Sequence, residues 1–498
     1  MKDLILILPE ILIALTLGFV VIGEITYHGE RYRLISITAL MGLASALIQS
    51  FLAYKYGPSQ VFNNTLSIDG LSFFFRLFFI SLAVLSIIVA IQTREISPNK
   101  RAEYTVLILA ATLGMCLAAS STDLLLAFLS LQFVNIIGYF LAGYAKRSPL
   151  SNEAAFKYML FGVVSAGLLA YGMALLFSAT HVLNIYEIHR SLLATPLSRE
   201  VSLVVFTLIF LSLSFQLGAF PMYLWAPDVL EGSPTPVSAF LSIGSRAAGF
   251  VIALRFLLVL FAQPSLTQGQ WEVLGQLDWT RLVALAAGLS MVIGSFLAMR
   301  QVGAKRMVAA LIVAETGHLL MGVLVLDSVG IAALLYNLMI ELFSITGIFF
   351  VLSFLMDELR SDRLEDLKGM LARAVPECVC LILFLITLVG LPPMPGFIGK
   401  FTLIGAALRQ HWMALAVVAI VSMAVSTVSV ARLSYCLIGD FRKSASQHPA
   451  DRTANCTMGT NHARHAFLAV LMIPVLLTGI FAEQALAWTA KSIQYILW

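Results

Sequence analysis

Fourteen apolar stretches run along the chain, and each is long enough to cross a lipid bilayer. A helix that spans the hydrocarbon core needs about 20 mostly apolar residues. Hydrophobic residues make up 60% of the 498 residues and charged residues only 12%, which lies outside the range of soluble globular domains. We therefore predict an all-α integral membrane protein with about 14 transmembrane helices, in which residues 1–498 form a single polytopic membrane domain. The stretches begin near Leu4, Leu34, Leu71, Tyr104, Leu124, Ala154, Val201, Val237, Leu282, Met307, Ile331, Cys378, Met413 and Ala466.

Basic residues are concentrated in every second loop between these stretches. Cytoplasmic loops of membrane proteins carry an excess of lysine and arginine. The basic loops are therefore expected in the cytoplasm and both termini on the periplasmic side, an arrangement that needs an even number of spans. The basic loops hold Arg31, Arg33, Arg94, Lys100, Arg101, Lys146, Arg147, Arg300, Lys305, Arg306, Arg360, Arg363, Lys368, Arg373, Arg442, Lys443, Arg452 and Arg464. The other loops hold little beyond Lys55, Arg190, Arg199, Arg281 and Arg409.

No motif of a soluble enzyme or of a cofactor site occurs in the sequence. Dinucleotide-binding, P-loop, zinc-protease and C-x-x-C patterns are all missing, and the net charge of +4 lies in loops rather than on a nucleic-acid-binding face. We expect this chain to bind no cofactor, no metal and no nucleic acid. A cleavable signal sequence is not expected either, because no small-residue cleavage site follows the first apolar stretch. The cysteines lack metal-ligand spacing: Cys116, Cys378, Cys380, Cys436 and Cys456.

Two of the apolar stretches are interrupted by proline and glycine in the same way. Residues 211–246 begin as an apolar helix pattern, meet Pro221 and resume the pattern after Pro236; residues 385–400 repeat this construction with the letters LPPMPG. Proline breaks a helix because it has no N–H group, and the freed backbone groups must then face protein or water. Broken helices mark ion and substrate sites in transporters. We predict an ion-translocating protein with two inverted repeats, roughly 104–262 and 282–438, each containing a broken helix.

Ionisable side chains inside the apolar stretches are the candidates for that ion route. Such groups are costly at the bilayer centre and therefore mark functional sites. Lys400 follows the second break, where a buried lysine can titrate; alternatively it is a helix-end cation near a membrane face. Lys157 lies about one turn into its helix and either joins the route or extends to the membrane interface. The candidates are Lys157, Arg246, Glu315, His318, Glu341 and Lys400.

Three of these candidates combine carboxyl and imidazole groups. Glu315 and His318 are three residues apart and share one helix face, and Glu341 lies in the middle of the next stretch. Groups of this kind can exchange protons; alternatively they are neutral and hydrogen-bonded, and hold helices together. Asp228 and Glu231 flank prolines in the first break, where we expect turns or caps. The run FFFRLFF at 73–79 is expected to face lipid or the core.

Four stretches resemble the antiporter-like membrane subunits of respiratory complex I, and most of all the subunit N group, equivalent to mitochondrial subunit 2. They are SNEAAFKYMLFG (151–162), PMYLWAPDVLEGSPTPVSAFLSIGSRAAGF (221–250), GAKRM (303–307) and GLPPMPGFIGKF (390–401). The resemblance implies a multi-pass subunit of a proton-translocating NADH–quinone oxidoreductase in a bacterial cell inner membrane. Other membrane subunits would be its partners. NADH, FMN, iron–sulfur clusters and quinone would be bound by partner subunits.

The resemblance also implies a central line of charged residues: a glutamate on the fifth helix and lysines on the sixth, seventh, eighth and twelfth. Lys157 and Lys400 match the sixth- and twelfth-helix lysines, and Arg246 stands at the position of the eighth-helix lysine. The fifth-helix glutamate is replaced by Gln132 and the seventh-helix lysine by Gln216. Losing both partners together leaves two neutral amides rather than one stranded buried charge.

Further departures lie near the breaks. Tyr223 stands where a histidine usually follows the seventh-helix proline. Glu315 stands where a histidine is usual and His318 where a tyrosine is usual, and Glu341 is an addition. Arg246 cannot relay protons as a lysine does, because arginine stays protonated.

These departures leave different functions open. In one hypothesis the subunit translocates protons, with Glu315, His318 and Glu341 replacing the lost pair while Lys157 and Lys400 are kept. In another, the amino-terminal half is inert and the subunit is a non-pumping structural or coupling link. A third alternative is a cation/proton antiporter subunit, or a membrane-bound hydrogenase subunit, with the same fold.

Overall fold

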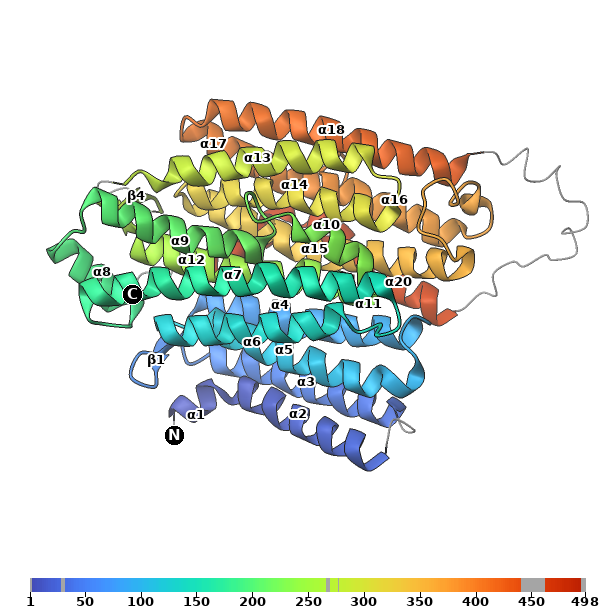
Figure 1. Ribbon diagram of the computed structural model, residues 1–498, viewed down its shortest axis with the longest axis horizontal. Helices are drawn as coiled ribbons and strands as arrows, with labels where there is room; N and C mark the ends of the chain where they lie inside the picture. Colours follow the sequence, from blue (N-terminus) through green and yellow to red (C-terminus); the bar gives the residue numbers. More distant parts are fainter. Residues whose placement is uncertain (1, 28–31, 266–268, 276, 440–461, 494–498) are drawn as a thin grey trace, which may run out of the picture.

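The computed structural model describes residues 2–27, 32–265, 269–275, 277–439 and 462–493. Long helices lie side by side along one direction, and the labelled strands β1 and β4 lie at the same end of the bundle, at the left of the view (Figure 1). Several sequence positions discussed above lie outside the described residues: Arg31, Arg442, Lys443, Arg452 and Cys456.

Helices make up almost all of the regular structure. The helices are α1 Lys2–Leu6, α2 Leu8–Tyr27, α3 Tyr32–Tyr54, α4 Gly70–Gln92, η1 Pro98–Lys100, α5 Arg101–Ser120, α6 Leu124–Ala142, α7 Pro149–Thr180, α8 Ile185–Ala194, α9 Arg199–Leu217, α10 Trp225–Gly232, α11 Thr235–Phe240, η2 Leu241–Ser245, α12 Arg246–Arg255, η3 Phe256–Leu260, α13 Trp279–Arg300, α14 Ala304–Leu324, α15 Ser328–Leu359, η4 Met370–Ala372, α16 Val375–Val389, α17 Pro395–Arg409, α18 Met413–Ile438, α20 His462–Ile480 and α21 Ala482–Lys491. Strand β1 (Ser59–Val61) pairs antiparallel with β2 (Leu66–Ile68), and β3 (Ala262–Pro264) with β4 (Trp271–Val273).

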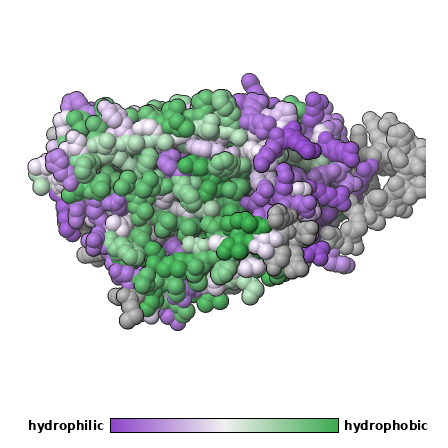
Figure 2. Space-filling view, turned by 60° about the horizontal axis from the view of Figure 1, so that its bottom comes forward, coloured by the Kyte–Doolittle hydropathy of each residue, from purple (hydrophilic) through white to green (hydrophobic). Residues whose placement is uncertain are grey.

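Within the described residues, 13 helices are long and apolar enough to cross a membrane. The fourteenth predicted span corresponds to α16, a shorter apolar helix of 15 residues, which continues beyond a break as α17. The surface agrees with this arrangement: Figure 2 shows a hydrophobic band across the molecule between two hydrophilic ends. The chain is therefore a multi-pass membrane protein, as the sequence predicts.

The first and last described helices lie at the same end of the bundle. The Leu6 carbonyl of α1 accepts a hydrogen bond from Arg76 near the start of α4. Ser492, directly after α21, packs against Gly70, the first residue of α4. We call this end, which also carries β1, β2 and α8, the terminus end, and the opposite one the far end (Figure 1).

The two breaks have the same local construction. α9 ends at Leu217 and α16 ends at Val389, and each is followed by a glycine in the left-handed region, Gly218 with φ 69° and Gly390 with φ 82°. Glycine adopts this conformation without the steric cost that a Cβ would bring, so it ends helices efficiently. The sequence predicts that Pro221 breaks the first helix. The helix in fact ends earlier, because Gly218 already terminates it.

Short helix α10 is a separate element after the first break. It runs toward the far end, where Gly232 packs closely on the Leu150 carbonyl of α7. The chain then reverses and α11, η2, α12 and η3 form one continuous span, Thr235–Leu260, that is buried throughout. Two segments of this span, η2 and η3, have the wider π-helical turn, which is rare and is frequent at functional sites.

We expect Gly396→Ala to disrupt the second break. A Cβ at residue 396 would lie 1.8 Å from the Thr387 carbonyl oxygen of α16, so α17 would have to move away; overpacking of this kind costs typically about 1–3 kcal/mol or more. The yield and thermal stability of the purified protein should both fall. Gly405→Ala on the same helix is the matched control, because nothing lies within 4 Å of its added Cβ. Equal stability of the two variants would contradict the close contact.

Candidate functional site

Four charged side chains from four helices meet in the interior of the bundle. Arg246 of α12 forms an ion pair with Glu341 of α15, and Lys400 of α17 forms an ion pair with Glu315 of α14. All four side chains are only 3–4% exposed. The Glu341 carboxyl also interacts electrostatically with Glu315 and Lys400. We call these four residues the charge line.

The second break positions Lys400. This residue lies in the second turn of α17, and its Nζ donates hydrogen bonds to the carbonyl oxygens of Leu388 and Val389, both at 2.9 Å. Those carbonyls belong to the last turn of α16 and have no partner within that helix. A cation at a helix C-terminus is also favoured by the helix dipole. Lys400 is therefore a buried member of the site rather than a helix-end cation near a membrane face.

The sequence of the α11–α12 span positions Arg246. Segment η2 ends at Ser245, and Arg246 is the first residue of α12. Its Nε and Nη1 atoms, and Glu341 Oε1, are buried without a hydrogen-bond partner among the described residues. A buried pair with unsatisfied donors and acceptors is less stable than a fully satisfied one.

His318 lies next to the charge line on α14. Its Nδ1 is 3.9 Å from Glu315 Oε2, which confirms that the two residues share a helix face. Nδ1 also lies 3.0 Å from the Ala314 carbonyl oxygen, and Nε2 lies 3.3 Å from the Ala419 carbonyl oxygen of α18. A neutral imidazole has one N–H and can donate to one of these two carbonyls at a time. His318 therefore adds a further polar group beside the two ion pairs, in which the Arg246 guanidinium is a permanent positive charge.

Lys157 lies apart from the charge line, in a network at the far end. Its Nζ is 2.8 Å from Glu153 and 2.5 Å from Asp228, and Arg306 of α14 pairs with both Asp228 and Glu231. The Lys157 side chain is 36% exposed. Asp228 and Glu231 thus lie on α10 and form ion pairs that join α7, α10 and α14, which corrects their interpretation as turn or capping residues. The local sequence does not reveal these ion pairs, because Arg306 comes from α14, a helix that is distant in the sequence.

The corresponding region of the first half is neutral. Gln216 Nε2 donates to the Ser245 carbonyl oxygen at 3.1 Å and to Ser245 Oγ at 2.9 Å, and Ser245 Oγ is 3.1 Å from the Tyr158 hydroxyl. Gln132 is partly buried on α6, and Tyr223 lies partly buried in the first break. The amide of Gln216 is therefore satisfied without any charged partner, as expected for a site that has lost both charges.

The carbonyls freed by the first break also have neutral partners. Trp225 Nε1 donates to the Phe215 carbonyl oxygen at 3.0 Å, and Thr316 Oγ1 donates to the Leu217 carbonyl oxygen at 3.2 Å. In the second break the equivalent task falls to the ammonium group of Lys400. The two breaks thus share backbone geometry but differ in charge.

Two further buried ion pairs were not predicted from the sequence. Glu10 of α2 lies 2.6 Å from Arg76 of α4, and Asp69 accepts two hydrogen bonds from Arg255 of α12, at 3.0 and 3.1 Å. Arg76 belongs to the FFFRLFF run, which packs in the core rather than against lipid. An arginine within such an apolar run is itself a signal for a buried acidic partner.

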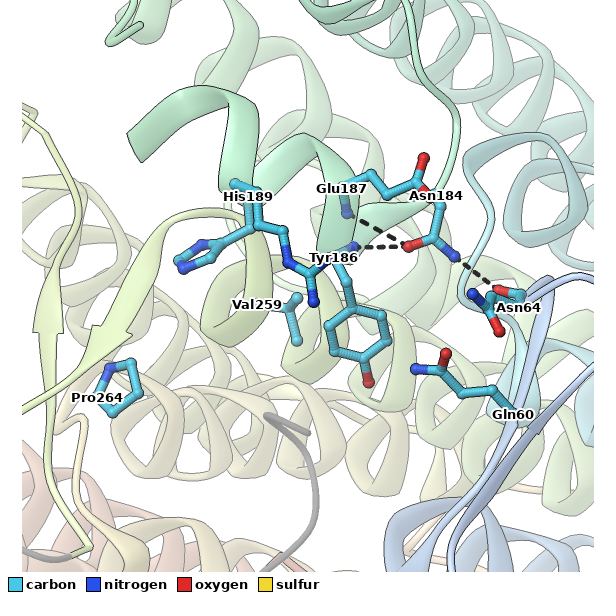
Figure 3. Close-up of a pocket in the computed structure, with 9 residues that line it drawn as sticks. Gln60, Asn64, Asn184, Tyr186, Glu187, His189, Val259 and Pro264 are labelled. Carbon is cyan, nitrogen blue, oxygen red and sulfur yellow. Dashed lines mark hydrogen bonds between the residues drawn. The ribbon is translucent and has the colours of Figure 1, made fainter. Parts of the chain in front are cut away.

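A polar cavity of about 190 Å³ lies at the terminus end, away from the charge line (Figure 3). Its wall includes Tyr186, Glu187 and His189 of α8, and Asn184 donates a hydrogen bond of 2.6 Å to the Asn64 carbonyl oxygen beside it. Burial lowers the pKa of His189, so this histidine is neutral at pH 7. Among the described residues, no group of three or more His, Cys, Asp or Glu side chains has the arrangement of a metal site.

Comparisons with known proteins agree on the type of chain. Residues 121–426 match the family described as NADH:quinone oxidoreductase/Mrp antiporter, TM. The NADH-quinone oxidoreductase subunit N of Chlorobium chlorochromatii is 34% identical in an alignment of 485 residues that covers 95% of this chain and 91% of that protein. A chain of respiratory complex I from Thermus thermophilus matches with 26% identity and a TM-score of 0.77, over 97% of this chain and 99% of that one. A chain of the Mrp complex from Dietzia has the same fold at 18% identity, with a TM-score of 0.81 over 100% of this chain and 97% of that one.

We expect Arg246→Met to destabilise the protein, because it leaves Glu341 buried beside Glu315 without its cation. Removing one partner of a buried pair costs about 3–5 kcal/mol. Thermal unfolding of the detergent-solubilised protein should occur at a clearly lower temperature. The double variant Arg246→Met with Glu341→Leu should recover most of the loss, because neither charge remains. If the single variant is as stable as the double variant, the pair does not contribute as described.

Proposed function

Because this chain belongs to the NADH:quinone oxidoreductase/Mrp antiporter family of membrane proteins, we propose that protons cross it through the charge line and His318. The chain is a membrane subunit of a proton-translocating NADH–quinone oxidoreductase of the complex I type, and it works beside other membrane subunits of that assembly. What remains to be assigned is the part played by its own residues.

The observation that carries the proposal is the electrostatic interaction between the two ion pairs of the charge line. Glu341, paired with Arg246, interacts with both members of the Lys400–Glu315 pair. Protonation of Glu341 removes its negative charge. The attraction between Glu341 and Arg246 then becomes weaker, and Lys400 interacts more strongly with Glu315. Each protonation therefore changes the balance of charge at the next site, which is the electrostatic basis for moving a proton stepwise.

In this proposal Glu315, His318 and Glu341 replace the glutamate and lysine that have become Gln132 and Gln216. Ionisable groups inside the membrane are costly and mark functional sites. Lys157 has a different place, because its ion pairs lie in the partly exposed network at the far end. We assign it to the proton-uptake side of the route, next to water rather than within the interior.

The orientation and the surrounding complex are part of the same proposal. The far end would face the cytoplasm and both termini the periplasm, in a bacterial cell inner membrane. NADH, FMN, iron–sulfur clusters and quinone would be held by partner subunits. This chain would receive the energy of electron transfer through its contacts with neighbouring membrane subunits.

A second candidate function is a subunit that serves structure and coupling without moving protons. The observation in its favour is the site of the lost pair in the first half, where Gln216, Ser245 and Tyr158 hydrogen-bond to one another without a charged partner. The two candidates differ in what they expect of the acidic residues in the second half.

The deciding experiment is proton translocation by the assembled complex in proteoliposomes, with Glu315→Gln and Glu341→Gln combined. Glutamine keeps the size of the side chain and a carbonyl oxygen that can still accept a hydrogen bond from Arg246 or Lys400, but it has no titratable proton. We expect the number of protons moved per electron to fall in the complex that assembles, while its quinone reductase activity persists; the amount assembled is measured alongside, because the buried cations lose their anionic partners. Glu200→Gln, an exposed carboxyl in the first turn of α9, is the matched control and should keep the wild-type ratio. An unchanged ratio in the double variant would favour the structural candidate.

A further inference from the structure

An apolar groove of about 300 Å³ lies on the outer surface of the molecule, between α13 and α18. Leu285, Gly288 and Val292 line it from α13, and Leu415 and Val418 line it from α18. Leu285 is 60% exposed, so the groove opens outward. Both helices are long and apolar enough to span the membrane. Because a polar molecule would lose its hydrogen bonds to water against such walls, the groove suits a hydrocarbon chain.

The groove occupies the part of α13 and α18 that lies nearest the terminus end. The two helices run side by side, and both begin at that end (Figure 1). Beyond the groove they are joined, because Ser422 Oγ donates a hydrogen bond to the Met291 carbonyl oxygen at 3.0 Å. Closer to the far end, Arg432 Nη1 donates to the Met299 carbonyl oxygen at 2.9 Å. The groove therefore closes toward the middle of the membrane and is open toward the terminus end.

Trp412 lines the groove where α18 begins. Its backbone N–H donates to the Ala407 carbonyl oxygen at 2.9 Å, which fixes the turn between α17 and α18. Tryptophan is enriched at the interface between lipid and water, where the ring is in apolar surroundings and the N–H group is near water. The position of Trp412 thus indicates that this end of the groove lies at the level of the lipid headgroups.

Two exposed arginines lie beside the same end of the groove. Arg281 precedes Leu285 and Gly288 by four and seven residues, so it lies on the face of α13 that lines the groove. Helical side chains are tilted toward the N-terminus of their helix, which directs the guanidinium group toward the headgroup level. Arg409 lies in the last turn of α17, three residues before Trp412, and is exposed.

These arginines leave a net positive charge at the headgroup level. The Arg281 side chain is 80% exposed, and its Nε lies 2.8 Å from the Asp278 carboxylate. Asp278 offsets one positive charge, and Arg409 supplies a second. Basic residues are scarce in the loops of the terminus end, so two arginines beside one groove depart from the general distribution. A phosphate group can accept charge-assisted hydrogen bonds from both guanidinium groups.

We propose that this groove binds an anionic phospholipid, with an acyl chain between α13 and α18 and the phosphate group held by Arg281 and Arg409. A helix of a neighbouring subunit would also cover the apolar walls, but it would bring no anion to the two arginines. The lipid site does not depend on the proton route, and it would exist whether or not protons cross this chain.

The bound acyl chain would pack against both helices that adjoin His318. Val418 of the groove wall directly precedes Ala419, whose carbonyl oxygen lies 3.3 Å from His318 Nε2. The other wall, α13, packs closely on the helix of His318, because a Cβ added at Gly317 would lie 2.6 Å from the Ala287 carbonyl oxygen. The lipid would therefore support the packing around His318 from the membrane side.

The experiment uses phosphatidylglycerol with a photoreactive diazirine in its acyl chain, added to the assembled complex in phosphatidylcholine proteoliposomes. Phosphatidylcholine with the same photoreactive chain is the comparison, because its headgroup has no net charge. Mass spectrometry of the digested protein identifies the labelled residues. In the wild-type complex we expect phosphatidylglycerol to label the groove residues several-fold more than phosphatidylcholine does.

Arg281→Gln combined with Arg409→Gln should remove this preference, because the phosphate group loses both cationic partners. Arg190→Gln combined with Arg199→Gln is the matched control. It also removes two exposed arginines, from α8 and from the first residue of α9, and it should keep the preference. Persistence of the preference in the Arg281/Arg409 variant would overturn the proposal.

A second variant, Gly288→Leu, fills the groove and leaves both arginines in place. An added Cβ at Gly288 meets Leu415 at an ordinary contact distance of 3.5 Å, so the helices need not move apart. Labelling of the groove by phosphatidylglycerol should fall several-fold, and unchanged labelling would overturn the proposed position of the acyl chain.

Two results in the wild-type complex would also overturn the proposal. Equal labelling by both lipids would mean that the groove contacts bulk lipid without selecting a headgroup. Absence of labelling by either lipid would mean that a neighbouring subunit covers the groove. Lipid labelling does not measure proton movement, so each of these results would leave the proposed function standing.

Discussion

The interior of this bundle depends on the mutual neutralisation of Arg246, Glu341, Glu315 and Lys400. Each charge alone would be strongly destabilising in an apolar surrounding. Together they form two ion pairs contributed by α12, α14, α15 and α17. The pairing therefore fixes how four helices from different parts of the chain pack against one another.

The two helix breaks show how one backbone design serves two electrostatic purposes. Both end a helix with a left-handed glycine, and both leave carbonyl groups without helical partners. In the first break the Trp225 indole and the Thr316 hydroxyl donate hydrogen bonds to carbonyl oxygens at the helix end. In the second break the Lys400 ammonium group does so. The conformation is therefore separable from the charge, because the first break adopts it with neutral partners only.

Much of this arrangement follows from local sequence. The spans are determined by hydropathy and the breaks by glycine and proline, which act on their immediate neighbours. The partners of the buried charges are a different matter: Glu341 and Arg246 are 95 residues apart, and only lateral packing brings them together. For the same reason the sequence did not reveal the pairs Glu10–Arg76 and Asp69–Arg255. It also gave Asp228 and Glu231 a local role, whereas their cationic partners come from α7 and α14.

The close contact between Gly396 and the Thr387 carbonyl has a consequence for the type of motion available at Lys400. With so little space between α16 and α17, the two half-helices form a stiff frame rather than a hinge. The lysine side chain, by contrast, has four rotatable bonds and ends in a compact charge. The Lys400 ammonium group can therefore move while the helices around it stay in place. It can change partners by rotamer exchange, which is much faster than the sliding or bending of whole helices.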